Sequence, residues 1–209
     1  MRLLLVIAAG ALALAIGALL LASLRDGSGS GDAAELGSGP FVGSEPPAGI
    51  TLPSFSLVDE AGRAVTDQSL RGSVAVVTFL DAQCTDACPV IGEIAARAVD
   101  RLAPDERRQV AIVGISVDPA EDTPTEVDAF LQRHRATGKL SYLVGGEREL
   151  TRVWRDFGVL AVAVSGDDDI HSAPVRIYAA DGEWVATLNA GADLTVDALV
   201  HDIRVALDE

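Results

Sequence analysis

The segment Ser73–Val90 constrains the fold more than any other part of the chain. Its first half, residues 74–80, is uncharged and mostly β-branched or aromatic, a composition typical of a strand buried on both faces of a sheet. Its second half carries both cysteines of the protein, Cys84 and Cys88, followed by Pro89 and a helical pattern. Proline suits the first turn of a helix because its missing N–H would have no partner there. We therefore expect the two thiols where a central strand ends and a helix begins, a position that favours thiolate over thiol.

Strands and helices alternate over the rest of the folded region. Thr123-Pro124-Thr125-Glu126 is a helix start, with threonine as the N-cap and proline at the first position. Asp181-Gly182 is a hairpin turn signal. Further strands are predicted at 55–58, 63–65, 110–117, 140–144, 175–178 and 184–188, and further helices at about 147–157 and 194–207. This order predicts an α/β fold with a mixed sheet flanked by helices, as in thioredoxin-like proteins.

The N-terminal run from Leu3 to Leu24 contains no charged residue and is bracketed by Arg2 and Arg25. As a helix, its roughly 22 residues would be about 33 Å long, enough to cross a bilayer core of about 30 Å. A cleaved signal peptide is the alternative, but the run lacks a convincing small-x-small end. We expect a transmembrane anchor at 1–25, a linker rich in glycine, serine and proline at 26–49, and a folded domain at 50–209. Arg2 favours an orientation that places this domain on the extracytoplasmic side of the cell membrane.

The overall charge excludes one class of partner. The chain has a formal net charge of −15 at pH 7, and its isoelectric point is near 4.4. A protein with this balance cannot neutralise phosphates, so a nucleic-acid partner is not expected.

The two cysteines alone are compatible with three kinds of site. Four residues apart on a helix, their Cα atoms would lie about 6 Å apart, within reach of a structural disulfide. A redox-active dithiol is the second interpretation, although its motif would normally be Cys-x-x-Cys. The third is a soft-metal site, which needs at least one further ligand.

Three histidines could supply that ligand. His134 lies in a charged helical stretch and His201 in the last predicted helix, where surface or structural roles are expected. His171 differs because it follows the acidic loop Gly166–Asp169 and precedes a strand. In a thioredoxin-like sheet, the segment before that strand faces the cysteines. Two thiolates and one neutral imidazole form a three-coordinate site suited to Cu(I), whereas structural Zn(II) requires a fourth ligand.

Three stretches together resemble the Sco/SenC family: Phe79–Pro89 with its Cys-x-x-x-Cys-Pro, Ile115–Pro124 with Ser-Val-Asp-Pro and Asp-Thr-Pro, and His171-Ser172. Proteins of that family are membrane-anchored, thioredoxin-like and copper-binding, and they help to assemble the binuclear copper centre of cytochrome c oxidase. The resemblance covers about residues 52–207. It implies that Cys84, Cys88 and His171 are copper ligands.

The resemblance also implies partners: the oxidase subunit that holds the copper centre and other copper carriers, with the membrane reached through the N-terminal helix. We expect a metallochaperone that delivers Cu(I). Two departures are visible, since Ile170 stands where the family usually has aspartate and Glu121 replaces a usual arginine. Pro174 stands where thioredoxins have a proline facing their dithiol. The alternative is therefore a thiol–disulfide oxidoreductase that reduces partner cysteines through Cys84 and Cys88, and whether the chain is an enzyme stays open.

Overall fold

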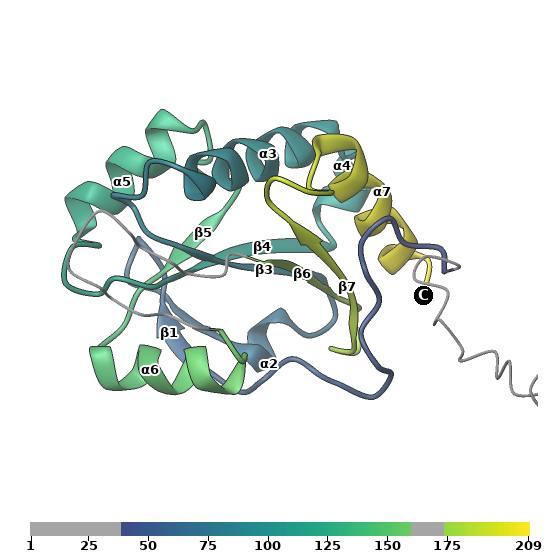
Figure 1. Ribbon diagram of the computed structural model, residues 1–209, viewed down its shortest axis with the longest axis horizontal. Helices are drawn as coiled ribbons and strands as arrows, with labels where there is room; N and C mark the ends of the chain where they lie inside the picture. The colour runs from purple at the N-terminus through teal and green to yellow at the C-terminus, as the bar shows by residue number, and fades with distance from the viewer. Residues whose placement is uncertain (1–38, 160–173) are drawn as a thin grey trace, which may run out of the picture. The chain divides into compact units, whose positions relative to one another are not determined.

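The computed structural model describes residues 39–159 and 174–209. A five-stranded sheet with the order β5-β4-β3-β6-β7 forms its centre, and helices cover both faces of this sheet (Figure 1). The strands β3, β4 and β5 are parallel, β6 is antiparallel to β3, and β7 is antiparallel to β6. This confirms the predicted mixed α/β sheet flanked by helices. The strands are β3 (Val74–Leu80), β4 (Val110–Ser116), β5 (Ser141–Leu143), β6 (Pro174–Tyr178) and β7 (Trp184–Asn189).

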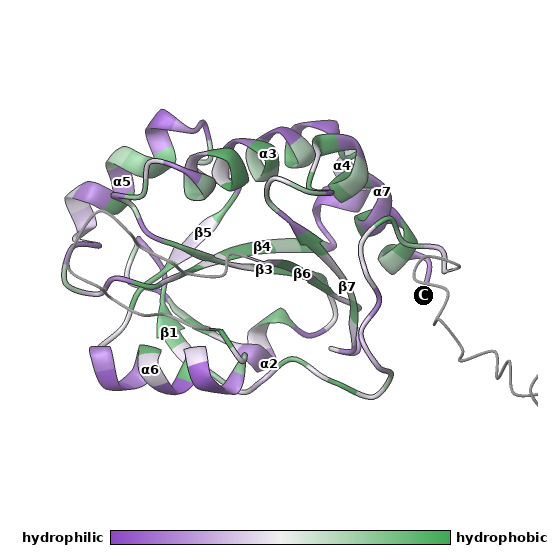
Figure 2. Ribbon diagram, in the orientation of Figure 1, coloured by the Kyte–Doolittle hydropathy of each residue, from purple (hydrophilic) through white to green (hydrophobic). Residues whose placement is uncertain are grey.

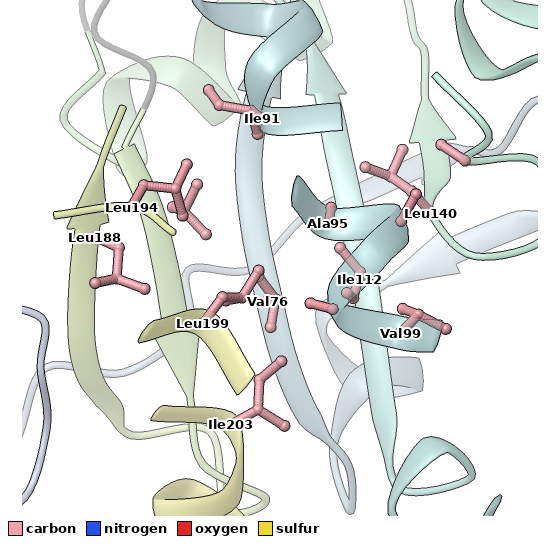
Figure 3. Close-up of a cluster of buried hydrophobic side chains, with 14 of the residues drawn as sticks. Val76, Ile91, Ala95, Val99, Ile112, Leu140, Leu188, Leu194, Leu199 and Ile203 are labelled. Atoms are coloured by element: carbon pink, nitrogen blue, oxygen red, sulfur yellow. The ribbon is translucent and has the colours of Figure 1, made fainter. Parts of the chain in front are cut away.

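The central strand β3 divides the hydrophobic core into two layers. All seven of its residues are buried, and alternate side chains point to opposite faces as the pleat of a strand requires. Val74 and Val76 lie on the side of α3 (Ala87–Arg101), α5 (Pro124–Arg133) and α7 (Val196–Leu207). Figure 3 shows this layer, with side chains from α3 and α7 packed on β3, β4 and β7.

The opposite layer contains Val77 and Phe79 of β3 and is covered by α6 (Glu147–Asp156) and α2 (Asp67–Leu70). A small hairpin, β1 (Ser56–Val58) and β2 (Ala64–Thr66), lies beside these helices. The helices are amphipathic, with hydrophobic residues toward the sheet and hydrophilic residues away from it (Figure 2).

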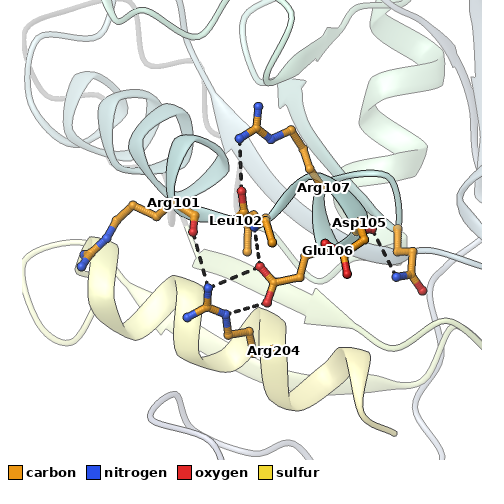
Figure 4. Close-up of polar contacts among 8 residues, drawn as sticks. Arg101, Leu102, Asp105, Glu106, Arg107 and Arg204 are labelled. Atoms are coloured by element: carbon orange, nitrogen blue, oxygen red, sulfur yellow. Dashed lines mark hydrogen bonds and ion pairs between the residues drawn. The ribbon is translucent and has the colours of Figure 1, made fainter.

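Two short helices, α2 and α4 (Pro104–Arg107), were not predicted from the sequence. The first is held by Thr66, whose side chain accepts a hydrogen bond from the Ser69 N–H. In α4, Glu106 accepts hydrogen bonds from the Ala103 N–H at 2.6 Å and from Arg204 of α7 at 2.8 Å (Figure 4). Local polar contacts stabilise these short helices, so hydrophobic periodicity does not predict them.

Residues 40–44 form a strap that packs against β7 and α7. Asp202, which is fully buried in α7, accepts hydrogen bonds from the N–H groups of Val42 at 2.7 Å and Gly43 at 2.9 Å. The strap also pairs with β7, because Ser44 and Thr187 exchange two backbone hydrogen bonds. These contacts fall within the range 26–49 that the sequence indicates as a linker.

The expected membrane anchor at 1–25 lies outside the described residues. Across residues 39–159 and 174–209, no helix has the length and apolar character to cross a membrane. The division of the chain into anchor, linker and domain therefore stays a prediction.

Candidate metal centre

The two cysteines lie where the sequence places them, at the end of the central strand. Cys88 is the second residue of α3 and is fully buried, whereas Cys84 lies in the preceding turn and is partly buried. The strands β3, β4 and β5 are parallel, so their carboxyl ends and the loops that follow them meet at this edge. In open α/β sheets this edge is the usual place for a binding site.

Backbone hydrogen bonds around Asp81 shape the turn that carries Cys84, which we call the cysteine loop (residues 81–86). The Asp81 N–H donates to the sulfur of Cys88 at 3.5 Å. The Cys84 N–H donates to the Asp81 carbonyl oxygen at 3.3 Å, and the Gln83 N–H donates to the Asp81 carboxylate at 2.7 Å. The loop therefore folds back on the start of α3 and brings the two thiols together.

The surroundings of Cys88 favour the protonated thiol in the metal-free protein. Its pKa is raised, first by its hydrogen bond with the Cys84 thiol and then by burial. This shift is opposite in sign to the one that the helix start alone would favour. The hydrogen bond with Cys84 and the loss of hydration on burial together exceed the benefit of the helix N-terminus.

A second buried carboxylate, Asp122, joins the cysteine loop to the sheet. One of its oxygens accepts a hydrogen bond from the Ala82 N–H at 2.8 Å. The other accepts from the Ser116 hydroxyl at 2.5 Å and from the Tyr142 hydroxyl at 2.9 Å. Burial raises the Asp122 pKa to about 6, against the lowering effect of these donors.

The structure describes two of the three histidines, His134 and His201. His134 ends α5 and is partly buried, its ring 4.7 Å from that of Phe130 between centroids. Burial lowers its pKa. His201 is exposed on α7, and its Nε2 lies 2.9 Å from the Pro40 carbonyl oxygen. Neither contact involves the cysteine loop, as expected from the sequence, although His134 is less exposed than a surface residue.

His171, the predicted third ligand, lies outside the described residues. Among residues 39–159 and 174–209, no three side chains of histidine, cysteine, aspartate or glutamate form a group that could hold a metal ion. The described part of the candidate site is therefore the pair of sulfurs. These are the soft donors that Cu(I) prefers, and two of them suffice for linear coordination.

Sequence reasoning did not find the residues that support the loop. Asp122 belongs to the Asp-Thr-Pro motif and Ser116 to the Ser-Val-Asp-Pro motif, but neither had a role assigned. The sequence offered one signal: both are polar residues next to predicted elements, since Ser116 ends an uncharged strand and Asp122 immediately precedes a helix start. Tyr142 lies on a third strand, and only the folded sheet brings it to Asp122.

Solved structures with a similar fold support this architecture. ScoI of Bradyrhizobium japonicum, solved with copper bound, is 29% identical over 76% of this chain and 100% of that one, with a TM-score of 0.61. Arabidopsis thaliana ScoI with copper bound is 25% identical over 76% and 99% of the two chains, with a TM-score of 0.63. BsSco, described as a member of the Sco family of cytochrome c oxidase assembly proteins, is 24% identical over 75% and 92%, with a TM-score of 0.63, and supports the fold.

The match to a family is broader than any single motif. The family model described as SCO1/SenC matches residues 44–208, which include the last residue of the strap, the cysteine loop, the Asp122 segment and all of α7. This range includes the three stretches on which the resemblance was based. The chain therefore belongs to the SCO1/SenC family.

Proposed function

We propose that the protein is a membrane-anchored metallochaperone that binds Cu(I) through Cys84, Cys88 and His171 and delivers it for assembly of the copper centre of cytochrome c oxidase. The observation that carries the proposal is the pair of adjacent thiols at the carboxyl end of β3. In this family, close structural relatives are known with copper bound. Copper is the cargo of this protein, so the site must both hold the ion and release it.

The chemistry of the two sulfurs favours Cu(I) over harder ions. Thiolates are soft ligands that select Cu(I), whereas Mg²⁺ and Ca²⁺ prefer oxygen. Both thiols must lose their protons on binding, and the raised pKa of Cys88 means that a proton leaves this site as copper enters. The imidazole of His171 would complete a three-coordinate site.

The proposed location follows from the first 25 residues. An N-terminal transmembrane helix would hold the domain on the extracytoplasmic side of the cell membrane, where the two cysteines can cycle between dithiol and disulfide. The proposed partners are the oxidase subunit that holds the copper centre and the carriers that supply copper.

Copper titration of the reduced full-length chain in detergent tests the proposal. One Cu(I) per chain is expected, with affinity lost in Cys84→Ser and in Cys88→Ser and substantially lowered in His171→Ala. His201→Ala is the matched control, because that histidine is exposed and contacts the strap. A stoichiometry well below one for the wild type would contradict the proposal.

A thiol–disulfide oxidoreductase is the second candidate, favoured by the hydrogen bond between the two thiols. Cys84 and Cys88 would pass two electrons and two protons to a partner disulfide and would themselves close a disulfide. This function predicts that each cysteine variant abolishes reduction of the partner, that His171→Ala has a smaller effect, and that Pro174→Ala has a larger one. Assembly of the oxidase copper centre in cells carrying each variant separates the two functions.

A further inference from the structure

We infer that Asp122 is a positioning residue for the two thiols: it holds the cysteine loop at the separation that a bound Cu(I) ion requires. The predicted effect of Asp122 on Cu(I) affinity rests on the proposed function, whereas its predicted effect on the stability of the Cys84–Cys88 disulfide does not. The family motifs Ser-Val-Asp-Pro and Asp-Thr-Pro thereby acquire a physical role at the site, although neither supplies a ligand.

Asp122 joins three separate parts of the fold through one side chain. Its Oδ1 accepts the N–H of Ala82, two residues before Cys84, and its Oδ2 accepts the hydroxyls of Ser116 at the end of β4 and Tyr142 in β5. The side chains of all four residues that take part are more than nine-tenths buried. A buried carboxylate with every donor in place is rigid, because breaking any one contact leaves a desolvated polar group.

The segment before Asp122 fixes this carboxylate in turn. The Val117 N–H continues the sheet by donating to the Leu80 carbonyl oxygen at 2.9 Å. The chain then turns at Asp118, whose carboxylate accepts from the Ala120 N–H at 3.0 Å and whose carbonyl accepts from the Asp122 N–H at 2.9 Å. Thr123 caps α5 directly afterwards by accepting from the Glu126 N–H. Asp122 is thus held between a turn and a helix start.

The other tether between the cysteine loop and the helices is weaker. The side-chain amide of Gln83 donates to Glu126 at 2.8 Å, and this contact is exposed to solvent. Exposed contacts of this kind contribute little to stability. The hydrogen bonds that Asp81 makes with Gln83 and Cys88 shape the loop. Asp122 adds a buried contact that joins the loop to β4 and β5 two residues before Cys84.

The expected magnitude comes from the behaviour of outer-shell residues in metal sites. Loss of a group that orients metal ligands typically lowers metal affinity by about 10–100-fold. A looser loop also lowers the effective concentration of one thiol at the other, which makes the Cys84–Cys88 disulfide less stable against glutathione. A tenfold fall in that equilibrium constant corresponds to a reduction potential about 30 mV higher.

The test compares Asp122→Ala with Asp122→Asn in the full-length chain in detergent. Asp122→Ala should lower Cu(I) affinity at least tenfold, measured by competition with a chromophoric Cu(I) chelator, and should destabilise the disulfide in glutathione buffers. Asp122→Asn should recover most of both properties. Its amide oxygen can still accept from Ala82, and its NH₂ group can donate to the two hydroxyl oxygens, which are also acceptors.

Asp202→Ala is the matched control, because it also removes a buried carboxylate that holds backbone N–H groups, but at the strap. It should lower the melting temperature and leave copper affinity unchanged. If Asp122→Ala does not fold, the double variant Ser116→Ala/Tyr142→Phe removes two of the three donors and should lower affinity at least threefold.

Three results would overturn the inference: wild-type affinity and disulfide stability in Asp122→Ala, wild-type values in the double variant, or an equal loss of affinity in Asp202→Ala. A wild-type protein that binds no copper would contradict the proposed function alone. In that case the disulfide equilibrium still decides the role of Asp122.

Discussion

Replacing Asp202 with alanine tests how the strap is attached to the domain. The carboxylate is fully buried in α7 and accepts the N–H groups of Val42 and Gly43. Gly43 itself lies so close to β7 that a Cβ atom there would be 2.6 Å from the Thr187 carbonyl oxygen. Without the carboxylate, water cannot easily reach these N–H groups while the strap stays in place.

The expected loss is large for a single side chain. Each hydrogen bond to a charged group contributes about 1.5–3 kcal/mol, and a buried N–H left without an acceptor costs about 1–3 kcal/mol. These contributions overlap, and the Val42 N–H is only partly buried, so we expect a loss of roughly 3–5 kcal/mol. For a protein of this length, each kcal/mol lowers the melting temperature by about 2–4 °C, which gives a fall of roughly 6–20 °C.

Thermal unfolding followed by circular dichroism measures the global effect, and amide hydrogen exchange at Ser44 and Thr187 measures the local one. Those two residues exchange backbone hydrogen bonds across the strap, so their protection should fall first. Asp197→Ala on the same helix is the control, because its ion pair with Arg101 is exposed and contributes about 0–1 kcal/mol. A melting temperature within 2 °C of wild type, with unchanged exchange at both amides, would refute the role of Asp202 in holding the strap.

The remaining predictions concern packing, accessibility and pH. Gly114→Ala should destabilise the domain by about 1–3 kcal/mol in urea unfolding, since the new Cβ would lie 2.4 Å from Leu80 Cδ1 in the core; an unchanged midpoint would contradict this. In the reduced protein, Cys84 should react with iodoacetamide well before Cys88, because Cys88 is fully buried. Mass spectrometry of quenched samples measures this order, and earlier labelling of Cys88 would contradict the prediction. The pKa of Glu106 is lowered by its hydrogen bond from Arg204. Its contribution to stability should therefore be complete above the ordinary pKa of 4.5 and lost as the pH falls through the lower folded value. Arg204→Ala should accordingly destabilise the protein at pH 7 and have little effect in strong acid, and a difference that persists there would argue against this ion pair.

Much of the fold follows from the sequence because its uncharged β-branched runs and helix-start signals are clear. The uncharged run at 74–80 identifies β3 and its burial on both faces. Thr123 and Pro124 mark the start of α5 to the residue. Strand order follows less directly, but a hairpin at Asp181-Gly182 and parallel strands joined by helices leave few alternatives.

What could not be predicted depends on contacts between distant residues. The strap lies in the range 26–49, whose richness in glycine, serine and proline predicts a flexible linker, yet Asp202, about 160 positions later, supplies its acceptors. The Asp122 network likewise needs β3, β4 and β5 side by side before Ala82, Ser116 and Tyr142 can share one carboxylate. The helix start predicted an activated thiol, but the hydrogen bond with the Cys84 thiol, and after it burial, raises the pKa of Cys88. Burial depends on the whole core and has no local sequence signal.

We propose that Cys84, Cys88 and His171 together bind Cu(I) for delivery. The most direct test is a Cu(I) competition titration of the reduced full-length wild type beside His171→Ala. We expect one Cu(I) per wild-type chain and a substantial loss of affinity in His171→Ala. The Cys84–Cys88 disulfide should still form in that variant, because the imidazole takes no part in the bond. Copper binding by His171→Ala with wild-type affinity would contradict the three-ligand site.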